Sequence, residues 1–221
     1  MIKMKKRILC YGDSNTWGYI AGSVKEDSPY IGRYSPDIRW TGRLQKLLGD
    51  DYLIIEEGLN GRTTNLDYTD FVGRNGKTYL FPCVYSHAPL DLVVLMIGCN
   101  DFKSFFNRRA SDVAAGVEEL IQLIQSTSYG PDMISAPNIL LIGYPVIKHE
   151  LGYEGLFKDG VEKSKEFNKL LSSLAIKYNI PFLDAAPHIK LSDIDGVHFT
   201  EEDHEEFSKL LLDKIKSMFV N

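Results

Sequence analysis

The stretch LVVLMIGCND, residues 92–101, places six apolar residues in a row directly before a glycine and the pair Asn100–Asp101. A strand needs an unbroken apolar run when both of its faces are covered, as in a parallel sheet packed between helices. A second run of this kind, ILLIG, occupies residues 139–143. The two runs therefore predict buried parallel strands at the centre of an α/β fold.

Candidate strands alternate with helical segments along the rest of the chain. The strands are expected at Arg7–Tyr11, Tyr52–Glu56, Leu92–Ile97, Ile139–Gly143 and Phe182–Asp184. Apolar residues recur at helical spacing in 113–124, 167–178 and 207–218, and Thr200 with Asp203 resembles a capping box before the last of these segments. This alternation predicts a doubly wound, three-layer sandwich around a five-stranded parallel sheet, with the flavodoxin-like order 2-1-3-4-5.

The composition favours one soluble, cytoplasmic domain covering residues 1–221. No repeat, low-complexity tract or linker-like segment interrupts the chain, and no apolar stretch is long enough to span a bilayer. The net charge of -5 argues against a nucleic-acid binder. The three cysteines are far apart and odd in number, which fits buried thiols in a reducing compartment.

Two long irregular segments, Ile20–Ile38 and Arg62–Asn75, are rich in Gly, Asp, Tyr and Pro. Such connections are either functional loops and partner surfaces or mobile surface loops. Their tyrosines suggest packing against neighbouring subunits, so a homo-oligomer is expected.

The segment GDSNT, residues 12–16, follows the first candidate strand, at the edge of the sheet where open α/β folds bind ligands. It has three interpretations: a phosphate-binding loop, a metal-binding turn or a nucleophilic serine. The spacing of the glycines matches neither G-x-x-x-x-G-K-[ST] nor G-x-G-x-x-G. A non-catalytic, flavodoxin-like nucleotide-binding protein stays open as an alternative.

The metal interpretation rests on Asp13, Asn100, Asp101 and His198, which would serve a metal-dependent phosphoesterase. The chain lacks an early Asp-x-His, and its five histidines never fall at a close spacing such as His-x-His. This class is the second alternative.

The serine interpretation gains support from DGVHFT, residues 195–200. A serine hydroxyl becomes a strong nucleophile only when a base removes its proton and a third group orients that base. Asp195, three residues before His198 in a turn containing Gly196, can hold that imidazole while its other nitrogen faces Ser14. Asn100 and the Asn60–Gly61 pair follow neighbouring strands, so they can supply donors for developing negative charge.

Four blocks of the sequence resemble the SGNH, or GDSL-type, esterase and lipase superfamily. They are GDSNTWG, GLNGRTT, GCND and DGVHFT, in this order over essentially the whole chain. The longer stretches RYSPDIRWTG, IIEEGLNGRTTN and APLDLVVLMIGCND are further similar to the bacterial arylesterase and acyltransferase branch.

The resemblance implies a role for each matching residue. Ser14 would be the nucleophile, His198 the general base and acid, and Asp195 the residue that orients His198. The oxyanion hole would consist of the backbone N–H groups of Ser14 and Gly61 and the side chain of Asn100. No metal and no organic cofactor is implied.

Two further positions would belong to the substrate pocket, and two depart from the family pattern. Trp17 falls where this branch lines the acyl pocket. Cys99 replaces a common threonine and could narrow the same pocket. Asn15 replaces the leucine of the GDSL name, and this change is expected to affect packing more than chemistry.

The remaining histidines receive no catalytic role. His204, in the acidic stretch EEDHEEF, is expected to be a solvated helix residue, and His87 to lie at a helix end. His149 and His188 lie in or beside loops. The sequence as a whole predicts a serine esterase that acts on small acyl esters through an acyl-enzyme on Ser14, with acyl transfer to alcohols as a further expectation.

Overall fold

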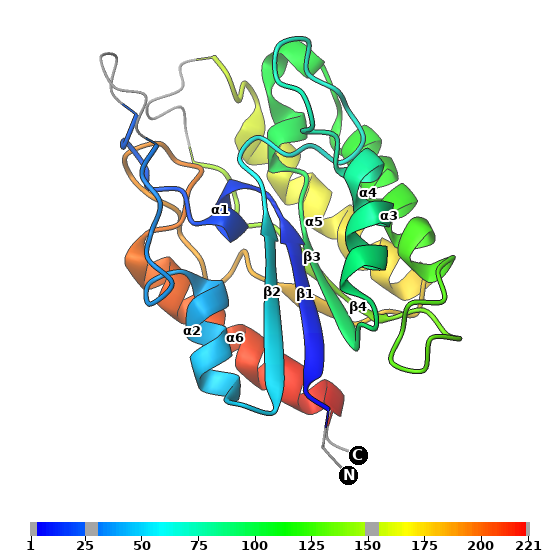
Figure 1. The fold of residues 1–221 in the computed structure, drawn as a ribbon. Helices are drawn as coiled ribbons and strands as arrows, with labels where there is room; N and C mark the ends of the chain where they lie inside the picture. Colours follow the sequence, from blue (N-terminus) through cyan, green and yellow to red (C-terminus); the bar gives the residue numbers. More distant parts are fainter. Residues whose placement is uncertain (1–3, 25–30, 149–154, 220–221) are drawn as a thin grey trace.

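The computed structural model describes residues 4–24, 31–148 and 155–219, and its centre is one parallel sheet with the order β2-β1-β3-β4-β5 (Figure 1). The strands are β1 (Lys6–Gly12), β2 (Tyr52–Gly58), β3 (Leu92–Met96), β4 (Asn138–Gly143) and β5 (Phe182–Asp184). The predicted strand order is confirmed, and every predicted strand end lies within two residues of the observed one.

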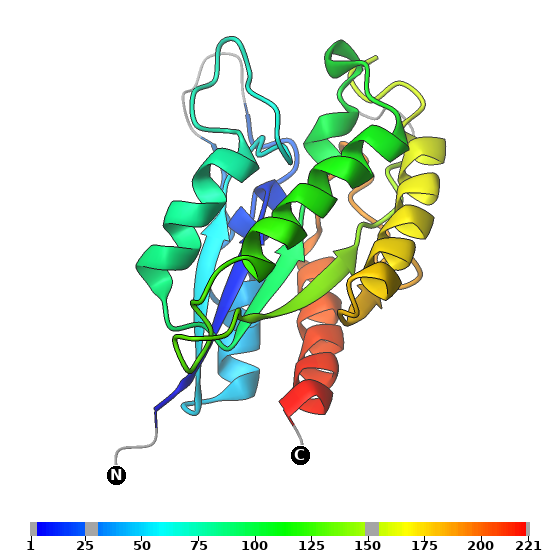
Figure 2. The same cartoon turned by 90° about the vertical axis from the view of Figure 1, so that its right-hand side faces the viewer.

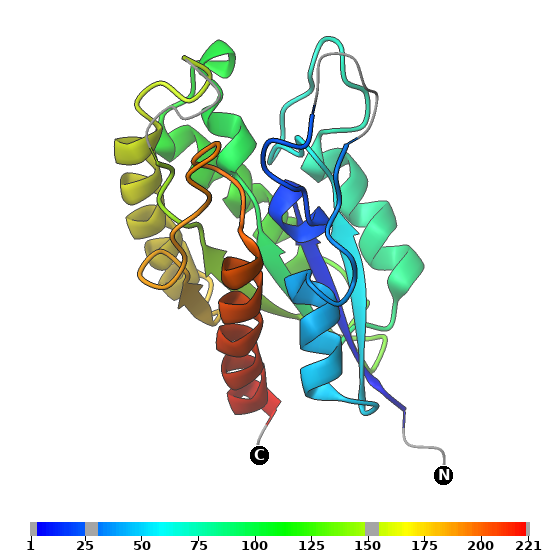
Figure 3. The ribbon, with the colours of Figure 1, turned by 90° about the vertical axis from the view of Figure 1, so that its left-hand side faces the viewer.

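Helices cover both faces of this sheet. They are α1 (Ser14–Trp17), α2 (Trp40–Leu48), α3 (Gly76–His87), α4 (Ala110–Gln125), α5 (Gly160–Lys177) and α6 (Glu201–Phe219), with two 3-10 turns, η1 (Cys99–Phe102) and η2 (Ser104–Phe106). Helices α3, α4 and α5 lie on one face, as Figure 2 shows, and α2 and α6 on the other, as Figure 3 shows. The expected three layers are present.

The apolar patterns of the sequence become the core. All five residues of β3 are buried, as a strand covered on both faces requires. The helical stripe of α4 is buried along its whole length, from Val113 to Ile124, and on the other face Phe207, Leu211 and Ile215 of α6 are buried. Each such side chain contributes about 1.5–3 kcal/mol through removal from water.

The short helix α1 rests directly on the carboxyl end of the sheet. A Cβ atom on Gly58, the last residue of β2, would lie 2.2 Å from the backbone nitrogen of Trp17. Only glycine allows this close approach of helix and strand. The contact holds the segment that carries Ser14 against the edge where all five parallel strands end.

Helix α6 begins with the predicted capping box. The Thr200 hydroxyl accepts a hydrogen bond from the Asp203 backbone N–H at 3.1 Å, and Asp203 accepts one from the Thr200 backbone N–H at 2.9 Å. The pair satisfies donors that a helix start leaves unpaired. It also anchors the end of the segment that contains His198.

The segment Arg62–Asn75 contains no helix or strand, apart from an isolated bridge between Thr63 and Asn75. The other irregular segment, Ile20–Ile38, lies partly outside the described residues. His149 lies outside them altogether. Among the described helices, none combines the length and apolar character that crossing a membrane requires.

The expectation that His204 is solvated is wrong. Its side chain is completely buried, its Nδ1 accepts a hydrogen bond from the Trp40 backbone N–H at 3.3 Å, and the rings of Tyr34 and Phe199 pack against it. Burial lowers the pKa of His204 to about 3, with the nearby Arg43 and Arg39 charges adding to the effect. Glu201, Glu202 and Glu206 are exposed, so the local composition gave no sign that His204 is buried.

His204 therefore makes stability depend on pH. In the unfolded chain a histidine binds its proton near pH 6.5, whereas the folded protein resists protonation down to about pH 3. Between these values the unfolded state binds more protons, so the free energy of unfolding should fall as the pH is lowered, by at most about 1.4 kcal/mol per pH unit. Urea titrations from pH 7 to pH 4 should show this loss, and His204→Gln should reduce it.

The exposed His188 provides the matched control, because His188→Gln should keep the slope of the parent protein. Equal slopes for the parent protein and His204→Gln would contradict the assignment.

Candidate active site

Ser14, His198 and Asp195 form one hydrogen-bonded chain. The Ser14 Oγ and His198 Nε2 atoms are 2.9 Å apart, and His198 Nδ1 lies 2.7 Å from Asp195 Oδ2. With the ring proton on Nδ1, the imidazole donates to the carboxylate and accepts from the serine hydroxyl. The structure thus brings together two residues that are 184 positions apart in the sequence.

The Asp195 carboxylate is fixed from several sides. Its Oδ1 accepts hydrogen bonds from the backbone N–H groups of Val197 at 3.1 Å and His198 at 3.0 Å. Burial alone would raise the pKa of Asp195, but the bonds from His198 and the two backbone donors hold this pKa below its usual range. The carboxyl group is therefore an ion that can orient the imidazole and stabilise its protonated form.

Asn15 holds the segment around His198 in place. Its side-chain NH₂ group donates to the Val197 carbonyl at 3.1 Å, and its side-chain oxygen accepts from the Phe199 N–H at 2.9 Å. These are the residues on either side of His198, so Asn15 ties the imidazole to the segment that carries Ser14. A leucine at this position could form neither bond, so Asn15 contributes hydrogen bonds as well as packing.

The buried Tyr144 hydroxyl and the Asp13 carboxylate fix the side chain of Asn15. The same NH₂ group donates to the Tyr144 hydroxyl at 2.7 Å, and that hydroxyl donates to the Asp13 carboxylate at 3.1 Å. Asp13 also caps helix α1 by accepting from the Asn15 N–H at 3.0 Å. Burial raises the pKa of Asp13 to about 6, although these hydrogen bonds oppose the shift.

The three segments that carry the proposed oxyanion donors start at paired residues of neighbouring strands. Gly12 of β1 pairs with Gly58 of β2 and with Met96 of β3, so the segments that follow these three residues leave side by side. They carry Ser14, Gly61 and Asn100 respectively, and all three line one cavity.

Both backbone donors are available for a ligand. Neither the Ser14 nor the Gly61 N–H donates to another group within the part of the chain that the structure describes. Gly61 has φ +76, a left-handed conformation that favours glycine. Asn100 uses one donor on the Arg62 carbonyl, at 3.2 Å, and its NH₂ group has a second donor left.

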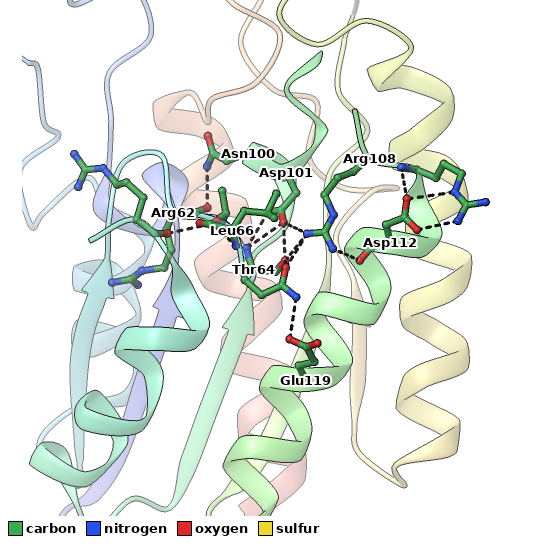
Figure 4. A network of polar contacts seen from close by, with 12 residues as sticks. Arg62, Thr64, Leu66, Asn100, Asp101, Arg108, Asp112 and Glu119 are labelled. Carbon is green, nitrogen blue, oxygen red and sulfur yellow. Dashed lines mark hydrogen bonds and ion pairs between the residues drawn. The ribbon is translucent and has the colours of Figure 1, made fainter. Parts of the chain in front are cut away.

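A polar network beneath these donors holds the 61–66 segment (Figure 4). The Asp101 carboxylate accepts from the Thr64 N–H at 2.9 Å and the Thr64 hydroxyl at 2.6 Å, and it pairs with Arg108 at 2.8 Å. Burial raises the pKa of Asp101 to about 6 in spite of these partners. On the other side Arg62, which is 2% exposed, donates to the Gly12 and Glu57 carbonyls.

This network removes the basis of the metal-dependent alternative. Asp101 faces Thr64 and Arg108, Asp13 faces Tyr144, and His198 is engaged by Ser14 and Asp195. Within residues 4–24, 31–148 and 155–219, the one group of three His, Cys, Asp or Glu side chains with converging ligand atoms is Glu57, Cys83 and His87, which includes none of the predicted ligands.

The cavity above Ser14 has a volume of about 150 Å³. Its lining residues are Ser14, Tyr19, Asn60, Gly61, Asn100, Lys103, Leu156, Phe157, Val197 and His198. Trp17 and Cys99, which the sequence predicts for the pocket, lie outside this lining. Trp17 packs under the Arg33 guanidinium, 4.8 Å from the ring centre, and Cys99 is 1% exposed in the core, where burial raises its pKa.

Sequence reasoning missed Tyr19, Lys103, Leu156 and Phe157 among the lining residues, and the first two have contacts that bear on the site. The Tyr19 ring lies 4.2 Å from the His198 ring, centre to centre, and covers one face of the imidazole. Lys103 donates to the Tyr68 hydroxyl at 3.0 Å, and burial lowers its pKa. Lys103 could have been found because it lies one turn after Asn100, whereas nothing in the sequence marks Tyr19 as a neighbour of His198.

Comparisons with known proteins agree with this geometry. A family model described as "GDSL-like Lipase/Acylhydrolase family" matches residues 10–205. The chain is similar to the native aryl esterase of M. smegmatis, with 37% identity and a TM-score of 0.88 over 97% of this chain and 100% of that one.

Two further solved structures have comparable similarity. Est24, a carbohydrate acetylesterase from Sinorhizobium meliloti, has 40% identity and a TM-score of 0.89 over 97% of this chain and 100% of its own. A putative arylesterase from Agrobacterium tumefaciens str. C58 has 29% identity and a TM-score of 0.86, with the same coverage. No curated protein matches the chain in sequence.

The bonds of Asn15 predict that its removal slows the reaction. Asn15→Ala leaves the Val197 carbonyl and the Phe199 N–H without their partner, so the His198 ring loses its fixed position. The kcat for p-nitrophenyl acetate should fall by about 10- to 100-fold with little change in KM, since small displacements at a reacting group cost this much. Asn15→Asp keeps only the acceptor, so its kcat should lie between those of the parent protein and Asn15→Ala.

The exposed Asn138, at the opposite edge of the sheet, provides the control, and Asn138→Ala should leave kcat unchanged. A variant Asn15→Ala that lost thermal stability but kept its kcat would show that Asn15 is only structural.

Proposed function

The chain belongs to the GDSL-like lipase/acylhydrolase family and is an esterase, and from this premise we propose that it cleaves small acyl esters through a covalent acyl-enzyme on Ser14. The observation that carries the proposal is the unbroken chain from Asp195 Oδ2 through the His198 ring to Ser14 Oγ, with contacts of 2.7 and 2.9 Å. Such a chain is the arrangement that activates a serine hydroxyl.

The first half of the reaction acylates the serine. Ser14 Oγ attacks the ester carbonyl carbon while His198 Nε2 takes the hydroxyl proton, and Asp195 stabilises the resulting imidazolium. The carbonyl oxygen becomes an oxyanion, which accepts hydrogen bonds from the Ser14 and Gly61 N–H groups and the Asn100 side chain. When the intermediate collapses, His198 gives its proton to the departing alcohol and the acyl group stays on Ser14.

The second half releases the acid. Water gives a proton to His198 and attacks the acyl carbon, and the same donors stabilise the second oxyanion. His198 then returns the proton to Ser14 Oγ. An alcohol in the place of water would yield a new ester, so acyl transfer is part of the proposal.

The dimensions of the cavity support a short acyl group. A volume of about 150 Å³ equals that of an engineered protein cavity that accommodates benzene. The similar structures are those of an aryl esterase and a carbohydrate acetylesterase, and the acetyl group of the second is a short acyl group. We propose aryl esters and carbohydrate acetates as substrates.

Two statements about the setting of the enzyme also belong to the proposal. A cytoplasmic location is supported by Cys10, Cys83 and Cys99, which are all free and buried. A homo-oligomer is supported by exposed apolar side chains near the site, namely Phe71, Val72 and Phe105.

Replacement of the nucleophile tests the mechanism. Ser14→Ala should lower kcat for p-nitrophenyl acetate by at least about a thousandfold, because the remaining groups cannot form the acyl-enzyme. Mass spectrometry after treatment with a serine-directed organophosphate should find the label on Ser14 in the parent protein and no label in the variant. Unchanged hydrolysis by a folded Ser14→Ala protein would overturn the mechanism, and loss of activity on chelation alone would favour metal chemistry.

The cavity volume predicts a preference for short chains. In a series of p-nitrophenyl esters, kcat/KM should be highest for acetate or propionate and should fall steeply for acyl groups too large to fit. A maximum at octanoate would contradict the assignment of this cavity to the acyl group.

A further inference from the structure

Glu57, Cys83 and His87 form a second cluster of reactive side chains outside the catalytic cavity. One carboxylate oxygen of Glu57, the Cys83 Sγ and a ring nitrogen of His87 all lie within 4.8 Å of one another. Glu57 is the last residue but one of β2, whereas Cys83 and His87 are four positions apart on α3 and so share one face of that helix. None of the three lines the cavity above Ser14.

The three donors suit a borderline divalent cation. Thiolate, imidazole and carboxylate are the ligands of zinc in proteins, and zinc prefers four of them at the corners of a tetrahedron. At the usual bond lengths of about 2.0–2.3 Å, two ligands of one zinc ion lie roughly 3.3–3.8 Å apart. His87 Nε2 and Glu57 Oε1 are 2.8 Å apart, so a small outward movement of these two side chains opens the position for the metal.

Access and rigidity also fit a metal site. The His87 side chain is 30% exposed and that of Glu57 19% exposed, whereas Cys83 is buried beneath them. An ion can therefore enter from solvent past the imidazole and reach a thiol held in place by the core. The partly exposed side leaves the fourth position to water.

We propose that Glu57, Cys83 and His87 bind one zinc ion as a three-ligand site with an open fourth position. On binding, the Cys83 thiol releases its proton to solvent and its sulfur bonds to zinc. The His87 ring keeps one proton on Nδ1 while Nε2 bonds to zinc, and the Glu57 carboxylate completes the set. The thiolate and the carboxylate neutralise the two charges of the ion.

Several groups around the cluster influence the affinity. Tyr79 lies beside Cys83 and Glu57, and the Arg62 guanidinium lies 5.4 Å from the centre of the Tyr79 ring. A second cation, Arg7, donates to the His87 backbone carbonyl at 3.0 Å. Burial and the Glu57 charge raise the pKa of Cys83 to about 12, while Arg62 lowers it. Metal binding releases the protons of its ligands, so zinc binding should strengthen as the pH rises.

The site also adjoins the donors of the active site. Arg62 donates to the backbone carbonyl of Glu57, and its own carbonyl accepts from the Asn100 side chain. A zinc ligand and an oxyanion donor are thus connected through one buried residue.

Metal titration of the full chain tests the proposal. The metal-free protein should bind one zinc ion per chain in isothermal titration calorimetry, more tightly at pH 8 than at pH 6. Cobalt(II), used as a spectroscopic substitute, should give the near-ultraviolet charge-transfer band of a cobalt–thiolate bond. Cys83→Ser should abolish this band, and both Cys83→Ser and His87→Ala should weaken zinc binding at least tenfold.

Matched variants identify the site. His188→Ala removes an exposed histidine, and His198→Asn removes the imidazole beside Asp195, so both should keep the zinc affinity and the cobalt band. Should Cys83→Ser fail to fold, the loss of affinity in His87→Ala still decides the question, because His87 lies at the end of α3 and is partly exposed. Absence of zinc binding, or binding and a band unchanged in His87→Ala, would overturn the proposal.

Discussion

The arrangement of the active site depends on the two hydrogen bonds that join Asn15 to the backbone on either side of His198. Ser14 comes from the start of the chain and His198 from the segment before the last helix, so no local structure holds them together. The serine–imidazole bond of 2.9 Å joins only the ends of two side chains, whereas Asn15 joins the Ser14 segment to the backbone beside His198. The amide of Asn15 supplies a donor and an acceptor in one plane, and this fixes both position and direction.

On the opposite wall of the cavity, buried charged side chains take the place of the Asn15 side chain. Asp101 is buried beside Asn100, and Thr64 and Arg108 satisfy its oxygens, while Arg62 reaches beneath Gly61 to the carbonyls of the first two strands. A buried ion is stabilised only by specific partners, so each partner must occupy a defined place. The proposed oxyanion donors are therefore held before any substrate arrives, which is the condition for strong electrostatic stabilisation.

The sequence predicted the strands, their order and the contacts that join Ser14, His198 and Asp195, because these depend on apolar runs and short motifs. Of helix α3 it predicted only the end at His87, because the stretch GKTYLFPCVYSH contains Pro82 and no clear apolar stripe. It also mistook His204 for a surface residue and gave no sign of the hydrogen bonds that Asn15 forms. In both cases the deciding partner, Trp40 for His204 and the His198 segment for Asn15, is distant in sequence, so local composition carried no information about it.

The burial of charged and titratable groups at this edge lowers the stability of the protein. Asp13 and Asp101 have pKa values raised to about 6, and His204 has one lowered to about 3, so each is costly to ionise in its buried position. All three lie near the carboxyl edge of the sheet, whereas β3 and the stripes of α4 and α6 supply apolar burial farther down. A parallel sheet allows this division, because its core can be purely apolar while one edge collects the polar ends of every strand. The apolar layers thus offset the free energy that burying charged groups at this edge costs. That burial is what keeps the active-site groups in fixed positions.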